Sequence, residues 1–190
     1  MKIILGSQSV VRKKILEKMG YEFEVMSADI DEKSIRFDDP VKLTMVLANA
    51  KADALVPRLD KDVILITSDQ VVVCSEMILE KPVDREEAKY FISLHLGHYS
   101  ETVTSVVVTN TSTGKRFAGT DIARIYFGNI PESVADEYIA TGDPFLHAGG
   151  FDHEHPLIRP FVRKIEGEPE SISGLPVRLT EELIKLAKEG

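Results

Sequence analysis

The spacing of apolar residues along this chain alternates between two periods. Runs of consecutive or alternating apolar residues predict strands, whereas apolar residues three and four positions apart predict amphipathic helices. Val11, Ile15, Leu16 and Met19, for example, follow the helical spacing. The expected strands are residues 2–5, 22–27, 63–74, 99–110 and 116–126. The expected helices are residues 9–20, 40–55, 84–96, 131–140 and 180–188, and residues 141–174 are expected to be largely irregular.

Capping and turn residues support these boundaries. Ser9 suits a helix N-cap, Pro40 suits a first helical turn, and "DREE" at residues 84–87 has the form of a capping box. The run "VILITSDQVVVC" is expected to form two buried strand segments, because residues 67–70 are mostly polar and interrupt it. A hairpin around "TSTG" at residues 111–114 adds antiparallel strands to an alternating strand and helix order.

The expected fold is therefore α/β, with a mixed and elongated β-sheet flanked by helices. We interpret residues 1–190 as a single two-lobed domain, because the sequence contains no internal repeat, low-complexity run or linker. With 43% apolar residues, a chain of 190 residues can fill a core, which argues against disorder.

Charge and composition exclude several classes of partner. Lys and Arg total 23 against 31 Asp and Glu, so the formal net charge is −8 and polyphosphate backbones and anionic membranes are repelled. Basic residues are not interleaved with aromatic ones, so we expect no nucleic-acid partner. Cys74 lies in an apolar run and is expected to be a buried, reduced thiol. The apolar stretch before Gly6 is too short for a signal peptide, and a cytoplasmic location is expected.

The stretch "GSQSVVRKKIL", which begins at Gly6, has the composition of an anion-binding turn. Ser7 and Ser9 add hydroxyl groups beside a helix N-terminus with unpaired N–H groups, and Arg12 adds a fork of donors suited to phosphate. The alternative is an ordinary tight turn and N-cap with a solvated arginine.

Asp69 is a second candidate, because a carboxylate inside an apolar run is costly unless it is paired, solvated or bound to a cation. It could take a proton from water or hold a hard divalent ion. The alternative is a strand-ending turn in which the aspartate caps local N–H groups.

Three further stretches carry weaker signals. Glu80 and Lys81 in "LEKP" could act on a substrate or form a solvated ion pair. The carboxylates of "DIDE" at residues 29–32 could bind a metal or face solvent. His153 and His155 would share a face and suit zinc if their segment were a strand, although no third ligand is evident; a polar patch or a substrate contact is the other interpretation.

Seven stretches occur together in an order that resembles the Maf-like nucleoside triphosphate pyrophosphatases. They are "SQSVVRKKIL", "DIDE", "LANAKA", "SDQVV", "LEKPVDREEA", "TGDPFLHAGGF" and "SGLP", and the resemblance extends from Ile3 to Pro176. It implies a hydrolase that cleaves a nucleoside triphosphate between the α and β phosphates with a divalent metal. It also implies a Maf/ITPase-like α/β fold with a deep cleft between two lobes, and a homodimer.

The resemblance also implies roles for individual residues. Asp69 matches the proton acceptor and Glu32 its acidic partner, and both are expected to bind Mg²⁺ or Mn²⁺, which prefer hard oxygen ligands. Whether Asp69 is a base, a ligand or both in turn stays open. The other expected catalytic residues are Glu80 and Lys81. The expected substrate-binding residues are Ser7, Ser9, Val11, Arg12, Lys51, Gln70 and Glu154. A triphosphate carries about four negative charges, so an acidic protein needs such local cations.

Base preference depends on three positions. Gln70 and Glu154 resemble the branch that acts on 7-methyl-GTP, since a glutamate can accept hydrogen bonds from N1 and the exocyclic amine of guanine. Val11 stands where other members have an arginine or an aromatic residue and fits neither branch. The expected substrate is 7-methyl-GTP or another modified or noncanonical nucleotide. The alternatives are a dTTP/UTP pyrophosphatase and, from a different class, a non-catalytic nucleotide-binding regulator of cell division.

Overall fold

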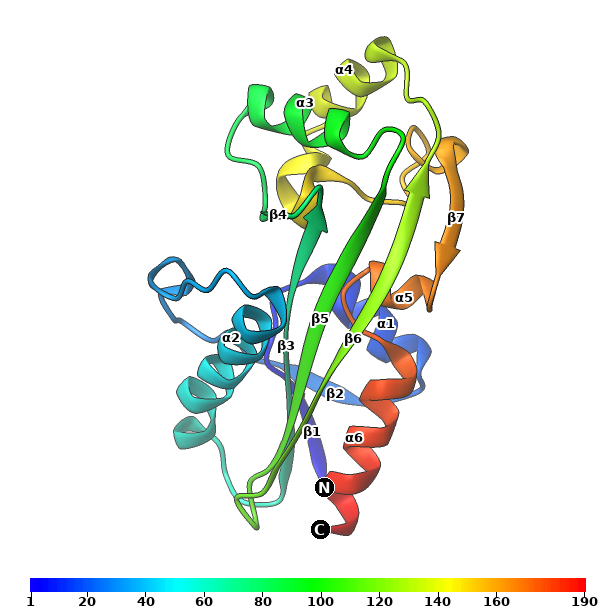
Figure 1. Cartoon of the computed structure of the whole chain (residues 1–190). Helices are drawn as coiled ribbons and strands as arrows, with labels where there is room; N and C mark the ends of the chain where they lie inside the picture. Colours follow the sequence, from blue (N-terminus) through cyan, green and yellow to red (C-terminus); the bar gives the residue numbers. More distant parts are fainter. The chain divides into compact units, whose positions relative to one another are not determined.

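The structure is a computed structural model that describes all residues from 1 to 190 (Figure 1). Its strands are β1 Lys2–Leu5, β2 Phe23–Val25, β3 Val63–Cys74, β4 Met77–Leu79, β5 Tyr99–Asn110, β6 Arg116–Phe127 and β7 Val162–Glu166. Its α-helices are α1 Val10–Lys18, α2 Pro40–Leu55, α3 Arg85–Leu94, α4 Glu132–Ala140, α5 Pro169–Ile172 and α6 Val177–Glu189. Short 3₁₀ helices occur between them.

The strands form one sheet that mixes parallel and antiparallel pairs. Its order is β2-β1-β3-β5-β6-β7, and β4 pairs with β3 off this path. Strand β1 runs parallel to β2 and to β3, whereas β4 is antiparallel to β3 and β7 is antiparallel to β6. The predicted α/β class with a mixed sheet flanked by helices is confirmed.

The chain divides into two compact units, and strands β3, β5 and β6 contribute residues to both. The first unit comprises Met1–Asp69, Thr104–Asp121 and Gly174–Gly190. The second comprises Gln70–Val103 and Ile122–Ser173.

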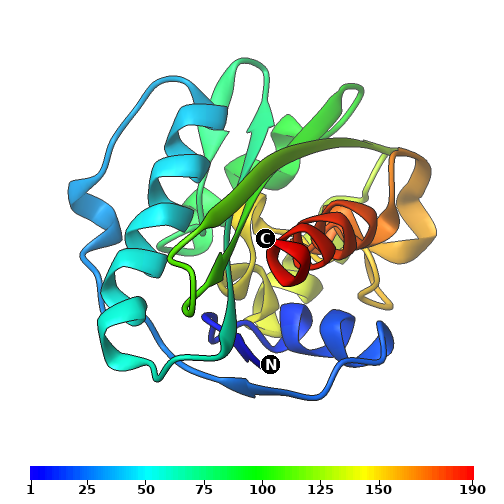
Figure 2. The same ribbon diagram turned by 90° about the horizontal axis from the view of Figure 1, so that it is seen from below.

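In the first unit, helices cover both faces of the sheet. Successive side chains of a strand point to opposite faces, so Ile3 and Leu5 pack with α1 and α6, while Ile4 packs with α2. Figures 1 and 2 both show α2 on one side of these strands and α1 with α6 on the other. The alternation in β1 therefore produces two separate apolar layers, one on each face.

The second unit has its own core, in which side chains of β3, β4 and β6 pack with those of α3, α4 and the segments that follow α4. Phe127 and Phe151 meet edge to face at 5.0 Å between ring centroids, and Tyr138 is completely buried. Cys74 is a free, buried thiol in this core, as predicted. Its Sγ donates to the carbonyl of Leu94 at 3.2 Å.

Several predictions about secondary structure are wrong in detail. Strand β3 is continuous through residues 67–70, because the side chains of Thr67, Ser68 and Asp69 are all accommodated as buried groups. Strands β4 and β7 and helix α5 are additional elements, two of them inside the stretch expected to be irregular. They are too short to carry a detectable period. Helix α6 begins at Val177, three residues before its expected start.

The histidines of "HEH" lie in turns and not on a strand. His153 and His155 therefore do not share a strand face, and the geometry on which the zinc interpretation depended is absent. His153 is buried, and the ring of His155 packs 4.8 Å from that of Tyr138. None of the helices combines the length and the apolar character that crossing a membrane requires.

Candidate active site

The turn between β1 and α1 depends on a close approach that only glycine permits. A Cβ on Gly6 would lie 2.7 Å from a methyl carbon of Leu55 and 2.7 Å from the methyl carbon of Thr67. Ser9 is the N-cap of α1 and its Oγ accepts from the backbone N–H of Arg12, as predicted. The Oγ of Ser7 accepts from the N–H of Ser9 at 3.2 Å. The glycine and the two serines therefore fix the start of the helix.

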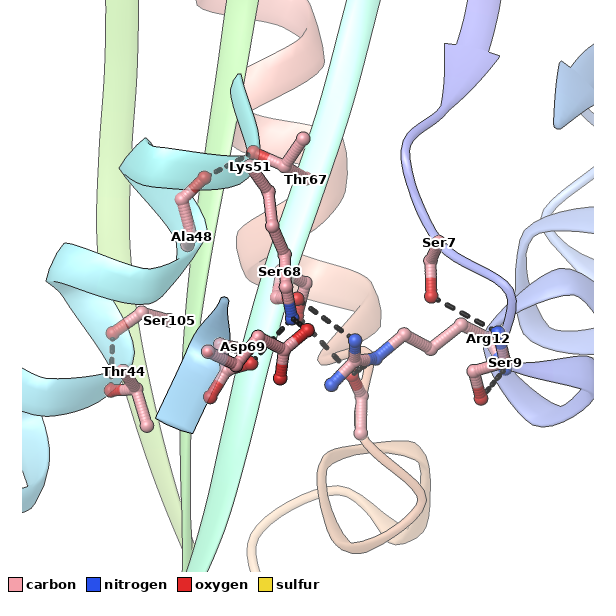
Figure 3. A network of polar contacts seen from close by, with 12 residues as sticks. Ser7, Ser9, Arg12, Thr44, Ala48, Lys51, Thr67, Ser68, Asp69 and Ser105 are labelled. Atoms are coloured by element: carbon pink, nitrogen blue, oxygen red, sulfur yellow. Dashed lines mark hydrogen bonds and ion pairs between the residues drawn. The ribbon is translucent and has the colours of Figure 1, made fainter. Parts of the chain in front are cut away.

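Arg12 is bound to the protein rather than solvated. Its Nε donates to the carbonyl of Gly174 and its Nη1 donates to the carbonyl of Ser68, each at 2.8 Å (Figure 3). The pKa of Arg12 is lowered, because desolvation by burial outweighs the attraction of Asp69 and Glu32, which acts in the opposite direction. A guanidinium carries five N–H donors, so two carbonyl contacts orient the group and leave donors for an anion.

Lys51 and Asp69 form a buried ion pair. Lys51 Nζ donates to Asp69 Oδ1 at 2.6 Å, and the two side chains are only 10% and 9% exposed. Glu32, whose side chain is half-exposed, places its Oε1 3.1 Å from the same Nζ. One ammonium group is therefore shared between two carboxylates that come from distant parts of the sequence.

A buried hydrogen bond sets the position of helix α2 against β3. Thr67 Oγ1 donates to the carbonyl of Ala48 at 2.8 Å (Figure 3). Ala48 precedes Lys51 by three residues, so both lie on the same side of α2. A second buried contact, 2.8 Å between the hydroxyl groups of Thr44 and Ser105, joins the same helix to β5. These contacts hold Lys51 against Asp69.

Burial is the largest influence on the acidity of Asp69. Desolvation raises its pKa, Lys51 and Arg12 lower it, and Glu32 raises it again, with a net shift above the usual range. A carboxylate with a raised pKa is a stronger proton acceptor than an exposed aspartate. The site thus combines a basic carboxylate with two cations that can face an anionic ligand.

The other residues predicted to bind substrate or take part in catalysis are not part of the contacts described above. Val11 is half-buried and packs against the apolar core of the first unit. Gln70, Glu80, Lys81 and Glu154 belong to the second unit. The amide nitrogen of Gln70 donates to the carbonyl of Ser171 at 2.8 Å, which orients its amide group. Glu80, Lys81 and Glu154 are exposed.

Two backbone groups in the site have no counterpart in the predicted set. The carbonyls of Ser68 and Gly174 hold Arg12, and Gly174 has a φ of 100°, in the left-handed region that favours glycine. Gly174 belongs to the "SGLP" stretch of the family resemblance. That its carbonyl accepts from Arg12, 162 positions away, is evident only in the structure. Sequence patterns do not report backbone acceptors at such separations.

The fold and this site define an α/β protein in which a buried carboxylate lies close to two cationic side chains, Lys51 and Arg12. The chain belongs to the Maf-like protein family, whose model matches residues 2–187. The predicted family is confirmed.

Curated relatives of the chain carry pyrophosphatase names. A protein of Dictyostelium discoideum named 7-methyl-GTP pyrophosphatase is 45% identical, over 96% of this chain and 95% of that protein. A dTTP/UTP pyrophosphatase of Alkaliphilus metalliredigens is 33% identical, over 93% and 91% of the two chains. A nucleoside triphosphate pyrophosphatase of a Synechococcus strain is 31% identical, over 96% and 92%.

Among solved structures, a nucleoside-triphosphatase (dITP/XTP pyrophosphatase) of Mycobacterium abscessus matches 69% of this chain and 75% of its own. The TM-score is 0.41 and the identity is 12%.

Proposed function

We propose that this protein hydrolyses a nucleoside triphosphate to a nucleoside monophosphate and pyrophosphate, with 7-methyl-GTP or a related modified nucleotide as its preferred substrate. The observation that carries the proposal is the buried Asp69 carboxylate, which faces Lys51 and Arg12 inside a chain of net charge −8. Cations concentrated at one buried position allow an acidic protein to bind a polyanion.

The reaction requires one proton acceptor and charge neutralisation. Asp69 removes a proton from a water molecule, whose oxygen forms a bond to the α phosphorus. The bond between that phosphorus and the oxygen bridging to the β phosphate breaks, and pyrophosphate leaves with the electron pair. Arg12 and Lys51 donate to phosphate oxygens through N–H groups that the protein does not already use. Glu80 and Lys81 are further catalytic candidates.

The donor set at Asp69 and Glu32 fits a hard divalent cation. Two carboxylates converge on Lys51, and each offers a second oxygen of the kind that Mg²⁺ and Mn²⁺ prefer. Such an ion, when bound, supplies positive charge that stabilises the phosphate oxygens. Asp69 and Glu32 are therefore the residues that we propose to hold it.

The base preference is inferred from Gln70 and Glu154. The 45% identity to the Dictyostelium 7-methyl-GTP pyrophosphatase supports it. The dTTP/UTP pyrophosphatase of Alkaliphilus, at 33% identity, supports a pyrimidine preference as the second candidate. A non-catalytic regulator is less well supported, because the paired Asp69 and the two cations are those that hydrolysis needs.

Three further features belong to this proposal. We treat residues 1–190 as one two-lobed domain, which the match of a single family model over residues 2–187 supports. A homodimer is implied by the family resemblance. Cytoplasmic action, without nucleic acid or membrane as partner, agrees with the net charge of −8.

The test is release of pyrophosphate from a panel of UTP, dTTP, GTP and 7-methyl-GTP with Mg²⁺ or Mn²⁺. We expect 7-methyl-GTP to be the best substrate and Asp69→Asn to lower turnover by about 10²–10⁴-fold, the usual contribution of a general base. Exposed Asp60→Asn is the control and keeps full activity. Nucleotide binding without pyrophosphate release would favour the regulator.

A second variant separates specificity from chemistry. Glu154→Gln should change the ranking of the bases while the reaction itself persists, and exposed Glu137→Gln is the matched control. An unchanged ranking would remove Glu154 from the base-binding residues without affecting the proposed reaction.

A further inference from the structure

Three side chains of the second unit converge outside the residues proposed for catalysis and base binding. Asp143, His147 and Asp152 each place one potential ligand atom within 4.8 Å of those of the other two. All three residues are half-buried. The group therefore combines two carboxylate oxygens with one imidazole nitrogen in a restricted space.

The local backbone brings these residues together. Gly142, with a φ of 80°, precedes the 3₁₀ helix Asp143–Leu146, and His147 follows that helix directly. Gly149 and Gly150 also have positive φ and turn the chain so that Asp152 returns toward Asp143. The cluster thus depends on a tight and specific chain path rather than on mobile surface side chains.

Two contacts of Gly149 fix that path. Its N–H donates to the carbonyl of Glu80 at 3.0 Å, and its carbonyl accepts from Nε2 of the buried His95 at 2.7 Å. A Cβ at this position would lie 2.9 Å from Val72, so the backbone approaches β3 closely. The segment that connects His147 to Asp152 is therefore fixed at Gly149 by two hydrogen bonds and by close packing against β3.

A buried hydroxyl group links the two carboxylate residues. The O–H of Tyr138, a completely buried residue, donates to Asp143 Oδ2 at 2.9 Å. The hydroxyl oxygen of Tyr138 in turn accepts from the backbone N–H of Asp152 at 2.7 Å. Hydrogen bonds of this kind behind a carboxylate are typical of metal sites, where they orient the ligand.

No lysine or arginine forms an ion pair with the carboxylates of the cluster. His147 Nε2 lies 3.6 Å from Asp143 Oδ2, a contact that is an ion pair only when the imidazole is protonated, and Asp152 forms no ion pair. Two carboxylates this close repel one another unless a cation lies between them. Asp69, by contrast, is paired with Lys51 and influenced by Arg12. The carboxylates of Asp143 and Asp152 therefore lack a Lys or Arg partner, and an added cation could pair with both.

We propose that Asp143, His147 and Asp152 bind a divalent transition-metal ion, with Zn²⁺ as the best match. An imidazole nitrogen favours Zn²⁺ over Mg²⁺ or Ca²⁺, and two carboxylates neutralise its charge. Three protein ligands leave at least one position for water. Bound there, the ion joins the start of the 3₁₀ helix to the far side of the glycine turn and stabilises the second unit.

The test measures metal binding by the full chain without nucleotide. Metal-free protein is titrated with Zn²⁺ in equilibrium dialysis, and Co²⁺ absorption reports the coordination. We expect one ion per chain, an affinity lowered more than tenfold by His147→Gln, and an unchanged affinity in the control His98→Gln, whose histidine is exposed. Tyr138→Phe, which keeps the core ring, should weaken binding by about 10–100-fold.

Asp69→Asn distinguishes this site from the proposed catalytic one. Zn²⁺ binding that persists in Asp69→Asn and is weakened in both His147→Gln and Asp152→Asn supports the inference, whatever the outcome of the pyrophosphate assay. Absence of Zn²⁺ binding by the unmodified protein, or equal affinity in all variants that retain their circular dichroism, overturns it. Binding lost only in Asp69→Asn assigns the ion to the other site and also overturns it.

Discussion

Lys51 Nζ lies 2.6 Å from Asp69 Oδ1, and both side chains are almost fully enclosed by protein. In such surroundings the mutual attraction of a charged pair offsets part of the loss of water, so removal of either partner leaves an uncompensated charge. The pKa of Asp69 is raised because desolvation, together with the nearby Glu32, outweighs the lowering effects of Lys51 and Arg12.

Lys51→Met should move the acidic limb of the pH–rate profile to higher pH. Lys51 is the largest of the influences that lower the pKa of Asp69, so its removal raises that pKa further. The general base then needs a higher pH to ionise. Profiles of kcat/KM from pH 5 to 9 test this, with exposed Lys61→Met as control. An acidic limb at the same pH in Lys51→Met would show that Asp69 is not the titrating base.

The same variant should lose stability in a pH-dependent manner. Above the pKa of Asp69 the carboxylate is ionised and lacks its closest partner, which costs about 3 kcal/mol of unfolding free energy. Below that pKa the folded state keeps a proton on Asp69, so the loss is smaller. Urea unfolding at pH 5 and pH 8 measures the difference. Equal losses at both values would contradict the pairing.

Arg12→Lys should lower the free energy of unfolding although it conserves the positive charge. A lysine cannot donate to the carbonyls of Gly174 and Ser68 with the planar geometry of a guanidinium. Loss of one charged hydrogen bond costs about 1.5–3 kcal/mol, and KM for the nucleotide should rise. Arg58→Lys, at an exposed residue with one carbonyl contact, is the control. Similar losses in the two variants would count against a special function of Arg12.

Gly6→Ala should destabilise the protein by overpacking. The new Cβ meets methyl carbons of Leu55 and Thr67 at 2.7 Å, and crowding of this kind costs about 1–3 kcal/mol. Thr67→Ser removes one of those methyl groups and keeps the hydroxyl group that donates to Ala48. The loss of unfolding free energy in the double variant should therefore be smaller than the sum of the losses in Gly6→Ala and Thr67→Ser. Strict additivity in a urea double-mutant cycle would refute the steric explanation.

His95 should make stability depend on pH between about 4 and 6.5. Burial lowers its pKa from 6.5 to about 4, and its Nε2 must donate to the carbonyl of Gly149, so Nδ1 accepts from Ser100 in the neutral form. Below pH 6.5 the unfolded chain binds a proton that the folded chain excludes, and about 3 kcal/mol is lost by pH 4.

His95→Gln removes this titration, so the Tm of the variant should change less between pH 4 and 6.5 than that of the unmodified protein. Exposed His98→Gln should keep the original slope. Equal slopes in all three proteins would show that His95 is not the group responsible.

The sequence alone determined the elements whose evidence is local. The spacing of Val11, Ile15 and Leu16 predicted α1, Ser9 predicted its N-cap, and the alternating order of strands and helices predicted the α/β class. Asp69 was recognised because a carboxylate in an apolar run needs a partner. Such signals depend on helical period, capping and burial cost, which neighbouring residues carry.

Only the tertiary structure decided what those residues contact. The 162 positions between Arg12 and Gly174, and the 18 between Lys51 and Asp69, leave no periodic signal in the sequence. Strand β3 passes unbroken through Asp69, because Lys51 provides the partner that makes a buried carboxylate tolerable inside a strand. The approach of Asp152 to Asp143 likewise arises from the turn at Gly149 and Gly150. Long-range packing sets these distances, and the order of residues records them only indirectly.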